Sequence, residues 1–282
     1  MSWISGQFTT RVIVLIPVAI AINIVLGYIV QTVLKLPIYL DSIGTILVGV
    51  LAGPLAGLLT GVLSNLIWQY APVIGGGTIG PFAITAGVIG FLAGIWGYLG
   101  VFRPRPASGT QLLLSAVVAA ALAILVVLPL VNNPIYLDPD QGGFVSWAVP
   151  AAIAIAIIVA VVVAGFIYVR RDLAGLWVAI AGIVTGVIAA IVSAPISAIV
   201  FEGVTGSGTD LIVAALRQGG ADVLSASLGQ GFFSDPIDKL ITFFVVFLVL
   251  VSLSPRFLAR FPLGERLTRP ASGAMPSADS RS

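Results

Sequence analysis

The chain contains no cysteine and no histidine, and only 9% of its 282 residues are charged. Without cysteine there is no disulfide framework, no thiolate nucleophile and no cysteine-based metal site. Without histidine there is no imidazole base that titrates near neutral pH. Soluble globular proteins carry about 25% charged residues, whereas 59% of this chain is hydrophobic. The sequence therefore predicts an all-α polytopic membrane protein that is not an enzyme and holds no cofactor or metal.

Two features that would supply energy for transport are also missing. No G-x-x-x-x-G-K-[ST] motif occurs, and the only lysines, Lys35 and Lys239, follow no glycine-rich phosphate loop. We therefore do not expect the chain to hydrolyse ATP by itself. Every charged residue is expected at or near a membrane edge, whereas ion-coupled carriers usually place one inside a span. This argues against a proton-coupled carrier. The argument does not apply to a sodium site built from carbonyls and hydroxyls, because such a site needs no charged residue.

Apolar runs long enough to cross a bilayer core about 30 Å thick recur along the chain. We expect eight spans, at about residues 12–34, 42–53, 54–70, 82–99, 112–131, 147–168, 173–200 and 237–253. The dipeptide Gly53-Pro54 is interpreted as a tight turn between two short spans, because Pro54 cannot donate a hydrogen bond within a helix. One long kinked helix is the alternative.

The basic residues predict the orientation of these spans. With the N-terminus in the cytoplasm, ten of the 13 Lys and Arg residues face the cytoplasm, in agreement with the positive-inside rule. They are Arg11, Arg103, Arg105, Arg170, Arg171, Arg256, Arg260, Arg266, Arg269 and Arg281. Both termini are then cytoplasmic. Residues 1–261 form the transmembrane domain, and the polar tail at 262–282 is predicted to be a disordered cytoplasmic end.

Small residues recur at helical spacing in several expected spans. They are Gly53, Gly57 and Gly61, then Gly87, Gly90, Gly94 and Gly97, then Gly182 and Gly186. Such faces allow close approach of helix backbones in lipid, so packing within the bundle is the first interpretation and docking of a partner membrane protein is the second. In the first span Asn23 shares a face with Ala19 and Gly27, and it needs a hydrogen-bond partner if it is buried.

Amide and aromatic side chains gather at the end of the span at 54–70. Asn65 and Gln69 lie one helical turn apart, and Trp68 and Tyr70 lie beside them. An interfacial aromatic belt would explain the two rings. Amides beside aromatic faces also fit a small-molecule pocket that holds the edge of a planar heterocycle. We take these four residues as candidate ligand-binding residues.

The start of the last span combines acids with a proline. Asp235 fits an N-cap, Pro236 the first helical position, and Asp238 the first turn near the positive end of the helix dipole. Capping explains both acids, and Asp41 is likewise interpreted as a cap. Capping does not explain Lys239, whose charge is unfavourable in a first turn, so we expect it to contact a ligand or an acid.

The outer loop at 201–235 is longer than most loops of compact proteins, and such loops are usually functional or disordered. It carries internal helix signals, because Thr209 can cap a short helix that stops at Gly219. We therefore expect this loop to form a lid.

Three segments of the chain resemble the substrate-specific S component of energy-coupling factor transporters. They read LPIYLDSIGTILVGVLAGPLAGLLTGVLSNLI at 36–67, GVTGSGTD at 203–210 and DPIDKLIT at 235–242. The resemblance covers roughly residues 12–100 and 173–258 and implies a core of six helices. The segment at 110–168 would then be an inserted transmembrane hairpin. Many members carry an A-x-x-x-A docking face in the first span, where this chain has Ala19, Asn23 and Gly27.

The resemblance also implies a function. Such a protein captures a vitamin or related micronutrient outside the bacterial plasma membrane, and works with a transmembrane coupling subunit and ABC ATPase subunits. The binder is thought to topple in the bilayer as ATP hydrolysis drives the coupling subunit. Its pocket lies at the outer side, which implicates the loop at 35–41, the start of the span at 82–99, Glu202, Asp238 and Lys239.

Two other classes stay open. One is a stand-alone ion-coupled secondary transporter, and the other is a sensor or structural membrane module. A sensor would need a signalling domain, and the tail after Leu253 is too short and polar to form one. The net charge of +2 gives no indication of a nucleic-acid partner. The sequence does not identify the ligand, and the outer acids indicate only tolerance of a neutral or cationic compound.

Overall fold

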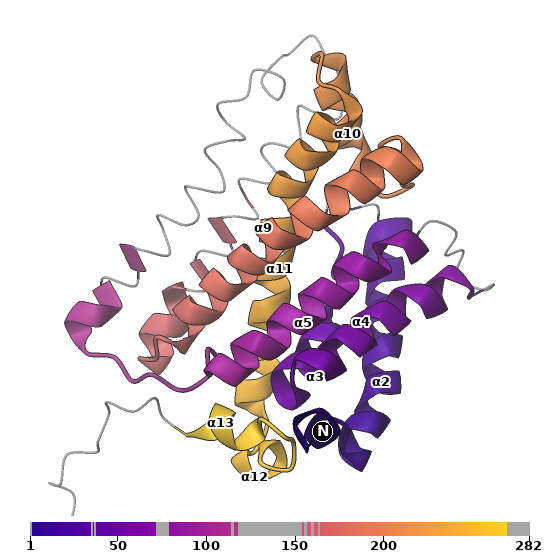
Figure 1. Cartoon of the computed structure of the whole chain (residues 1–282). Coiled ribbons are helices and arrows are strands. Elements are labelled where there is room, and N and C mark those ends of the chain that lie inside the picture. The colour runs from indigo at the N-terminus through magenta and orange to yellow at the C-terminus, as the bar shows by residue number, and fades with distance from the viewer. Residues whose placement is uncertain are drawn as a thin grey trace, which may run out of the picture.

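The computed structural model describes residues 2–34, 36, 38–71, 79–113, 116–117, 154, 157–158, 161–162 and 164–269. Every regular element within these ranges is a helix (Figure 1). They are α1 (Ser2–Gln7), α2 (Thr10–Gly27), the π-helical turn η1 (Tyr28–Val33), α3 (Ile43–Ala52), α4 (Pro54–Gln69), the 3₁₀ turn η2 (Gly80–Phe82), α5 (Ala83–Leu99), α9 (Ala174–Phe201), α10 (Asp210–Gln218), α11 (Val223–Ser252), α12 (Pro255–Leu258) and α13 (Gly264–Thr268). The prediction of an all-α protein is confirmed for this part of the chain.

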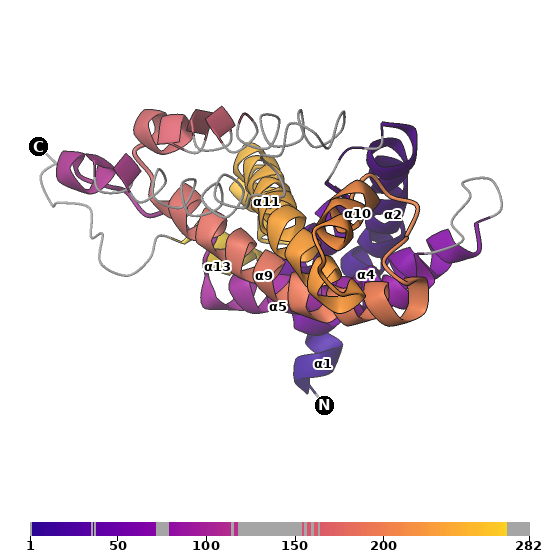
Figure 2. The same cartoon turned by 90° about the horizontal axis from the view of Figure 1, so that it is seen from above.

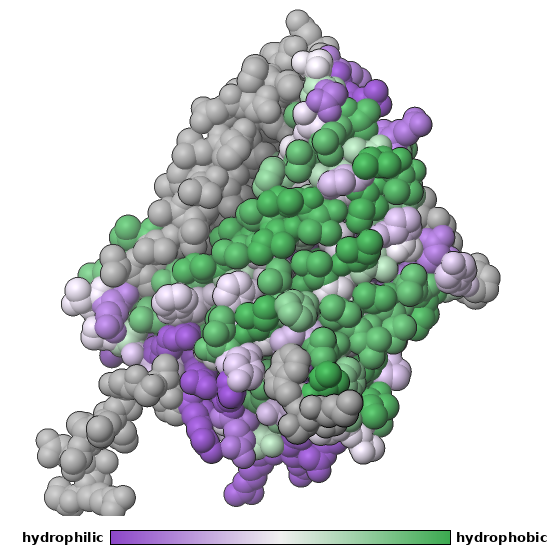
Figure 3. Space-filling view, viewed as in Figure 1, coloured by the Kyte–Doolittle hydropathy of each residue, from purple (hydrophilic) through white to green (hydrophobic). Residues whose placement is uncertain are grey.

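Three helical stretches are long and apolar enough to cross a membrane, namely Thr10–Val33, Gly80–Leu99 and Ala174–Phe201. Figure 3 shows apolar residues over a broad band of one face, with hydrophilic residues at both ends of this band, near α12 and α13 and near α10. These features describe a membrane-embedded protein. The count of eight spans stays a prediction, because most of the expected hairpin at 110–168 lies outside the described residues.

The Gly53-Pro54 turn separates two helices, as predicted. Gly53 has a φ of +123°, a conformation that costs glycine little because it has no Cβ atom. Pro54 is the first residue of α4, where the missing backbone N–H has no intrahelical partner to lose. The alternative of one long kinked helix is therefore wrong.

Glycine faces bring helix backbones into direct contact inside the bundle. A Cβ atom at Gly57 would lie 2.2 Å from the carbonyl oxygen of Gly90, where α4 crosses α5. In α9, a Cβ atom at Gly186 would lie 2.5 Å from the carbonyl oxygen of Asp235 and from the Cα of Pro236 in α11. Any larger residue would force these helices apart. The interpretation that these glycines serve packing within the bundle is confirmed at these two helix crossings.

Asn23 ties α2 to α3 and α4. Its Nδ2 donates to Thr45 Oγ1 at 2.8 Å and to Ser64 Oγ at 2.9 Å, and its Oδ1 accepts from the backbone N–H of Gly44 at 2.7 Å. The expected need for a partner is thus confirmed. Ala19, on the same helix face, is fully buried. This face packs inside the chain, which leaves it closed to a partner protein in this structure.

The prediction for the start of the last span is wrong. Helix α11 begins at Val223, and its N-cap is Asp222, which accepts a hydrogen bond from the backbone N–H of Ser225 at 3.0 Å. Asp235 and Asp238 lie in the interior of this helix and cap nothing. Buried contacts with α9 and α10 hold the Gly- and Ser-containing first turns of α11 in helical form, although local propensity is weak there.

A second correction concerns the tail at 262–282, which the sequence predicts to be disordered. Residues 262–269 are ordered and include α13, although the composition predicts disorder. The backbone N–H of Leu263 donates to the carbonyl of Leu51 at 2.9 Å, and Leu267 is buried. These two leucines give an otherwise polar segment an apolar side that packs on the bundle. Residues 270–282 lie outside the described part of the chain.

Helix α10 occupies the position expected for the short helix of the outer loop. It follows Thr209, ends before Gly219, and lies at the end of the bundle where α11 begins (Figure 2). Its buried residues Ile212, Val213 and Leu216 form a small apolar cluster with α11. The loop therefore has a packed core of its own, and its role as a lid stays a prediction.

Candidate ligand pocket

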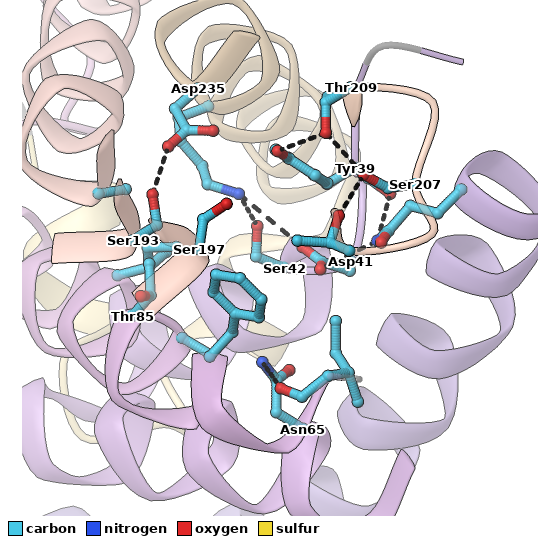
Figure 4. A pocket seen from close by; sticks show the side chains of 18 of the residues that line it. Tyr39, Asp41, Ser42, Asn65, Thr85, Ser193, Ser197, Ser207, Thr209 and Asp235 are labelled. Carbon is cyan, nitrogen blue, oxygen red and sulfur yellow. Dashed lines mark hydrogen bonds and ion pairs between the residues drawn. The ribbon is translucent and has the colours of Figure 1, made fainter. Parts of the chain in front are cut away.

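A pocket of about 100 Å³ lies where the loop at 38–42 and the loop before α10 meet α4, α5, α9 and α11 (Figure 4). About 10–15 Å³ of such space holds one water, so the pocket can take several waters or a small solute. Most of its lining residues are polar. They are Gln31, Tyr39, Asp41, Ser42, Asn65, Thr85, Ser193, Ser197, Thr205, Ser207, Thr209, Gln230, Asp235 and Lys239.

An ion pair in the middle of α11 forms one part of the wall. Lys239 Nζ donates to Asp238 Oδ2 at 2.5 Å and to Ser42 Oγ at 2.8 Å. Asp238 is fully buried and Lys239 nearly so. The two side chains neutralise each other in a site where either charge alone would be strongly unfavourable.

Asp238 also fixes the loop that covers the pocket. Its Oδ1 accepts from the backbone N–H of Tyr39 at 2.9 Å and of Leu40 at 2.8 Å. Leu40 has a φ of +52°, which is uncommon for a residue with a Cβ atom. Tyr39 then donates from its hydroxyl to Thr209 Oγ1 at 3.2 Å and accepts from Gln230 Nε2 at 3.0 Å. One carboxylate therefore holds the loop in place between α10 and α11.

Asp41 does not cap α3. The helix N-cap is Ser42, whose side chain makes no capping hydrogen bond. Asp41 Oδ2 instead accepts from Gln31 Nε2 at 3.1 Å, and its Oδ1 lies 3.9 Å from Lys239 Nζ. Burial raises the pKa of the Asp41 carboxyl, and the nearby Lys239 opposes that rise. The expectation that Lys239 contacts an acid is met twice, by Asp238 and Asp41.

Asp235 lies on the next turn of α11 toward the helix start. Its carboxylate accepts from Ser193 Oγ of α9 at 3.3 Å, and this contact is drawn in Figure 4. The close approach of α9 and α11 at Gly186 sets this geometry, because Gly186 packs on the backbone of Asp235 itself. The polar wall continues along α9 with Ser197, one turn beyond Ser193.

Five apolar residues complete the lining, namely Ile79, Phe82, Ala86, Ile89 and Ala189. Phe82 stacks on Phe201 of α9 with ring centroids 5.5 Å apart and ring planes within 10° of parallel. The pocket thus combines an aromatic and aliphatic part with a part rich in hydroxyls and carboxylates, as small-molecule sites usually do.

Three of the seven candidate residues meet at this pocket. Asn65 and Lys239 line it, and Asp238 lies directly behind Lys239. Asn65 Nδ2 donates to the carbonyl of Ile79 at 3.5 Å, which is a long contact. The start of α5 and the loop before α3 also line the pocket, and their part in ligand binding stays a prediction. Lys35 lies outside the described residues.

The other four candidates lie elsewhere. Trp68 is buried against Gly27 in α2, and its indole N–H has no partner among the described residues. Gln69 accepts from the backbone N–H of Gly80 at 2.7 Å. Tyr70 is 81% exposed, and Glu202 is exposed at the end of α9. Helical rotation turns Trp68 away from Asn65, whereas Gln69 shares the face of Asn65 one turn further along α4 and bonds to Gly80 instead of lining the pocket.

The sequence analysis does not predict several of the residues that line the pocket. Ser193 and Ser197 are four residues apart in an apolar helix, so their shared face could have been recognised. Thr85 and Gln230 carry no comparable local pattern, because hydroxyl and amide side chains are common in membrane helices. Asp235 was noticed but assigned to capping.

Comparisons with protein-family models, with curated proteins and with solved structures find no match to this chain. The resemblance to S components therefore depends on the three quoted segments alone. No group of three or more Asp, Glu, His or Cys side chains within the described ranges is arranged to hold a metal ion. The described geometry fits reversible binding of a small molecule.

Proposed function

We propose that this protein is the membrane-embedded substrate-binding subunit of an importer of the energy-coupling factor type. In this proposal it captures a small micronutrient and delivers it inward together with a transmembrane coupling subunit and ABC ATPase subunits. The observation that carries the proposal is the pocket itself. It combines polar side chains with an apolar surface, lies among long apolar helices, and is covered by a loop that is hydrogen-bonded to a buried carboxylate.

We place the end of the bundle near α12 and α13 in the cytoplasm. Arginines gather there and bond to backbone carbonyls, as Arg266 does to Tyr98 at 2.9 Å and Arg103 does to Arg266 at 2.9 Å. The positive-inside rule then assigns the opposite end, with the loop at 38–42 and α10, to the outside. A ligand would enter from that side.

An ion-coupled secondary transporter is the second candidate. The sequence argument against it assumed that every charge lies near a membrane edge. Asp235, Asp238 and Lys239 instead lie inside α11 and are buried. Buried ionisable groups within helices are typical of ion pathways, so this observation favours the alternative.

Uptake in reconstituted vesicles distinguishes the two candidates. We expect the purified chain alone to bind its ligand without accumulating it, whatever ion gradient is applied. Accumulation should require the coupling subunit, the ATPases and ATP. Accumulation by the chain alone, driven by a proton or sodium gradient, would contradict the proposal and support the secondary transporter.

The pocket is tested by a matched pair of variants, one in α4 and one at its C-cap. Asn65→Ala removes a polar group from the lining, whereas Tyr70→Ala removes an exposed ring outside it. We expect the occupancy of a co-purified small molecule, measured by native mass spectrometry, to fall about 5- to 10-fold in Asn65→Ala. Tyr70→Ala should retain it. Equal occupancy in both variants would show that the ligand binds elsewhere.

A further inference from the structure

The charges around the pocket do not balance. Three carboxylates, those of Asp41, Asp235 and Asp238, face one ammonium group, that of Lys239. Lys239 is the sole basic residue among the described residues of the lining. It is bonded to Asp238 and lies 3.9 Å from Asp41, while no ion pair joins it to Asp235 in the described part of the chain. Asp235 is therefore left without an ion pair, and Lys239 acts on it only from a longer distance.

The surroundings of Asp235 do little to stabilise a negative charge on its carboxylate. The residue is 4% exposed, so water does little to stabilise its charge. Its hydrogen bonds come from two hydroxyls, Ser193 at 3.3 Å and Ser234 at 3.4 Å. Hydroxyls bonded to a carboxylate normally approach to about 2.5–2.7 Å. The carboxylate therefore has unused capacity to accept hydrogen bonds on the side of the pocket.

A second observation comes from α5. The hydroxyl of Thr85 lines the same pocket, is 7% exposed as a residue, and has no hydrogen-bond partner in the described structure. Figure 4 draws Thr85 near Ser193, the residue whose hydroxyl bonds to Asp235. Buried polar atoms are nearly always paired, so an unpaired hydroxyl in a pocket indicates a partner supplied by a ligand.

The apolar part of the lining also indicates which class of ligand the pocket can bind. Phe82 offers an aromatic ring, and aromatic faces attract organic cations. An organic cation would satisfy the carboxylate and contact the apolar part of the lining at the same time.

We infer that the pocket selects a small organic cation, an amine or ammonium compound, whose charged nitrogen pairs with Asp235 and whose polar atoms reach Thr85 and Ser193. This inference rests on the proposed binding function and adds the class of its substrate. The ligand supplies the positive charge that the chain itself lacks at this point. Anionic compounds are excluded by the same carboxylates.

The test uses two fractions of one bacterial metabolite extract as probes. Strong cation exchange at pH 7 divides the extract into a retained, cationic fraction and an unretained fraction. Each fraction is dialysed to equilibrium against the full-length chain in lipid nanodiscs, and mass spectrometry identifies the compounds that concentrate with the protein. We expect enrichment from the cationic fraction only.

Asp235→Asn is the critical variant, because it keeps the shape of the side chain and removes its charge. We expect it to reduce enrichment by about 10- to 100-fold. Asp222→Asn is the matched control, since it removes an exposed carboxylate outside the pocket and asparagine is also a good N-cap. It should bind as the wild type does.

Thermal unfolding of the ligand-free protein separates binding from folding. Asp235→Asn should unfold at or above the wild-type temperature, because it removes a buried charge that has no partner. A large drop in that temperature would show that Asp235 serves the fold, and would overturn the inference.

Two binding outcomes would also overturn it, namely enrichment from the unretained fraction alone and unchanged enrichment in Asp235→Asn. Enrichment from neither fraction would instead count against the proposed function as a whole.

Discussion

The two ends of the bundle use charged residues in opposite ways. At the end near α12 and α13, the charges lie at helix termini and bond to carbonyl oxygens, as Arg105 does to Gly100 and Val101 at the end of α5. At the pocket end, the charges of Asp235, Asp238 and Lys239 lie in the interior of α11. The first group faces helix carbonyls and solvent, and the second group depends on specific side-chain partners.

This difference indicates which charges serve orientation and which serve binding. A cation near a helix C-terminus is favoured by the helix dipole and can be replaced by another cation at little cost. A charge in the interior of a buried helix must be matched by a partner or it destabilises the protein. Removing single charges at the two ends should therefore have effects of very different size.

The largest effect is expected for Asp238→Asn. The change leaves Lys239 buried without its ion-pair partner and weakens the bonds to the backbone of Tyr39 and Leu40. We expect the free energy of unfolding to fall by about 3–5 kcal/mol. Chemical denaturation in detergent, followed by circular dichroism, measures it.

A double variant sharpens this prediction. Asp238→Asn combined with Lys239→Met removes both charges, so neither is left alone, and most of the lost stability should return. If the single variant unfolds within about 0.5 kcal/mol of the wild type, a typical value for a surface change, the buried pair does not control stability at the pocket end.

An intermediate effect is expected for Arg266→Ala at the opposite end. Arg266 donates to the carbonyl of Tyr98 at 2.9 Å, and its guanidinium lies 4.2 Å from the centroid of the Tyr98 ring. Loss of one hydrogen bond and one cation–π contact should cost about 1 kcal/mol. The same denaturation assay applies, and Arg266→Lys should recover part of the loss. A cost as large as that of Asp238→Asn would remove the contrast between the two ends.

The smallest effect is expected for Arg269→Ala. Arg269 forms an ion pair with Glu265 at 2.8 Å, one turn away in the same segment, and the two side chains are 76% and 67% exposed. Exposed pairs at this spacing contribute about 0.3–0.5 kcal/mol. High salt should reduce even this difference, since solvent ions screen exposed charges. A salt-independent loss above 1 kcal/mol would show that this pair has a structural role.

The packing of the bundle could be predicted from local patterns. The Gly53-Pro54 turn, the glycine faces and the buried Asn23 all follow from properties of single residues, namely a positive φ, a missing Cβ atom and an amide that needs partners. The pocket could be predicted only in part. Asn65 and Lys239 are the predicted residues that line it, whereas Trp68 packs against α2 and Gln69 bonds to the backbone of Gly80 one turn beyond Asn65.

The sequence by itself determined that the chain is helical and lies in a membrane. Its apolar runs are long enough to cross a bilayer, and a helix satisfies the backbone hydrogen bonds of such a run where no water is present. Only the tertiary structure decided where α11 begins and which acids are paired. A local N-cap pattern around Asp235 resembles a helix start, but contacts with α9 and α10 continue the helix upstream to Val223. Charge pairing depends on the distances between helices that are remote in the chain, and no local pattern encodes those distances.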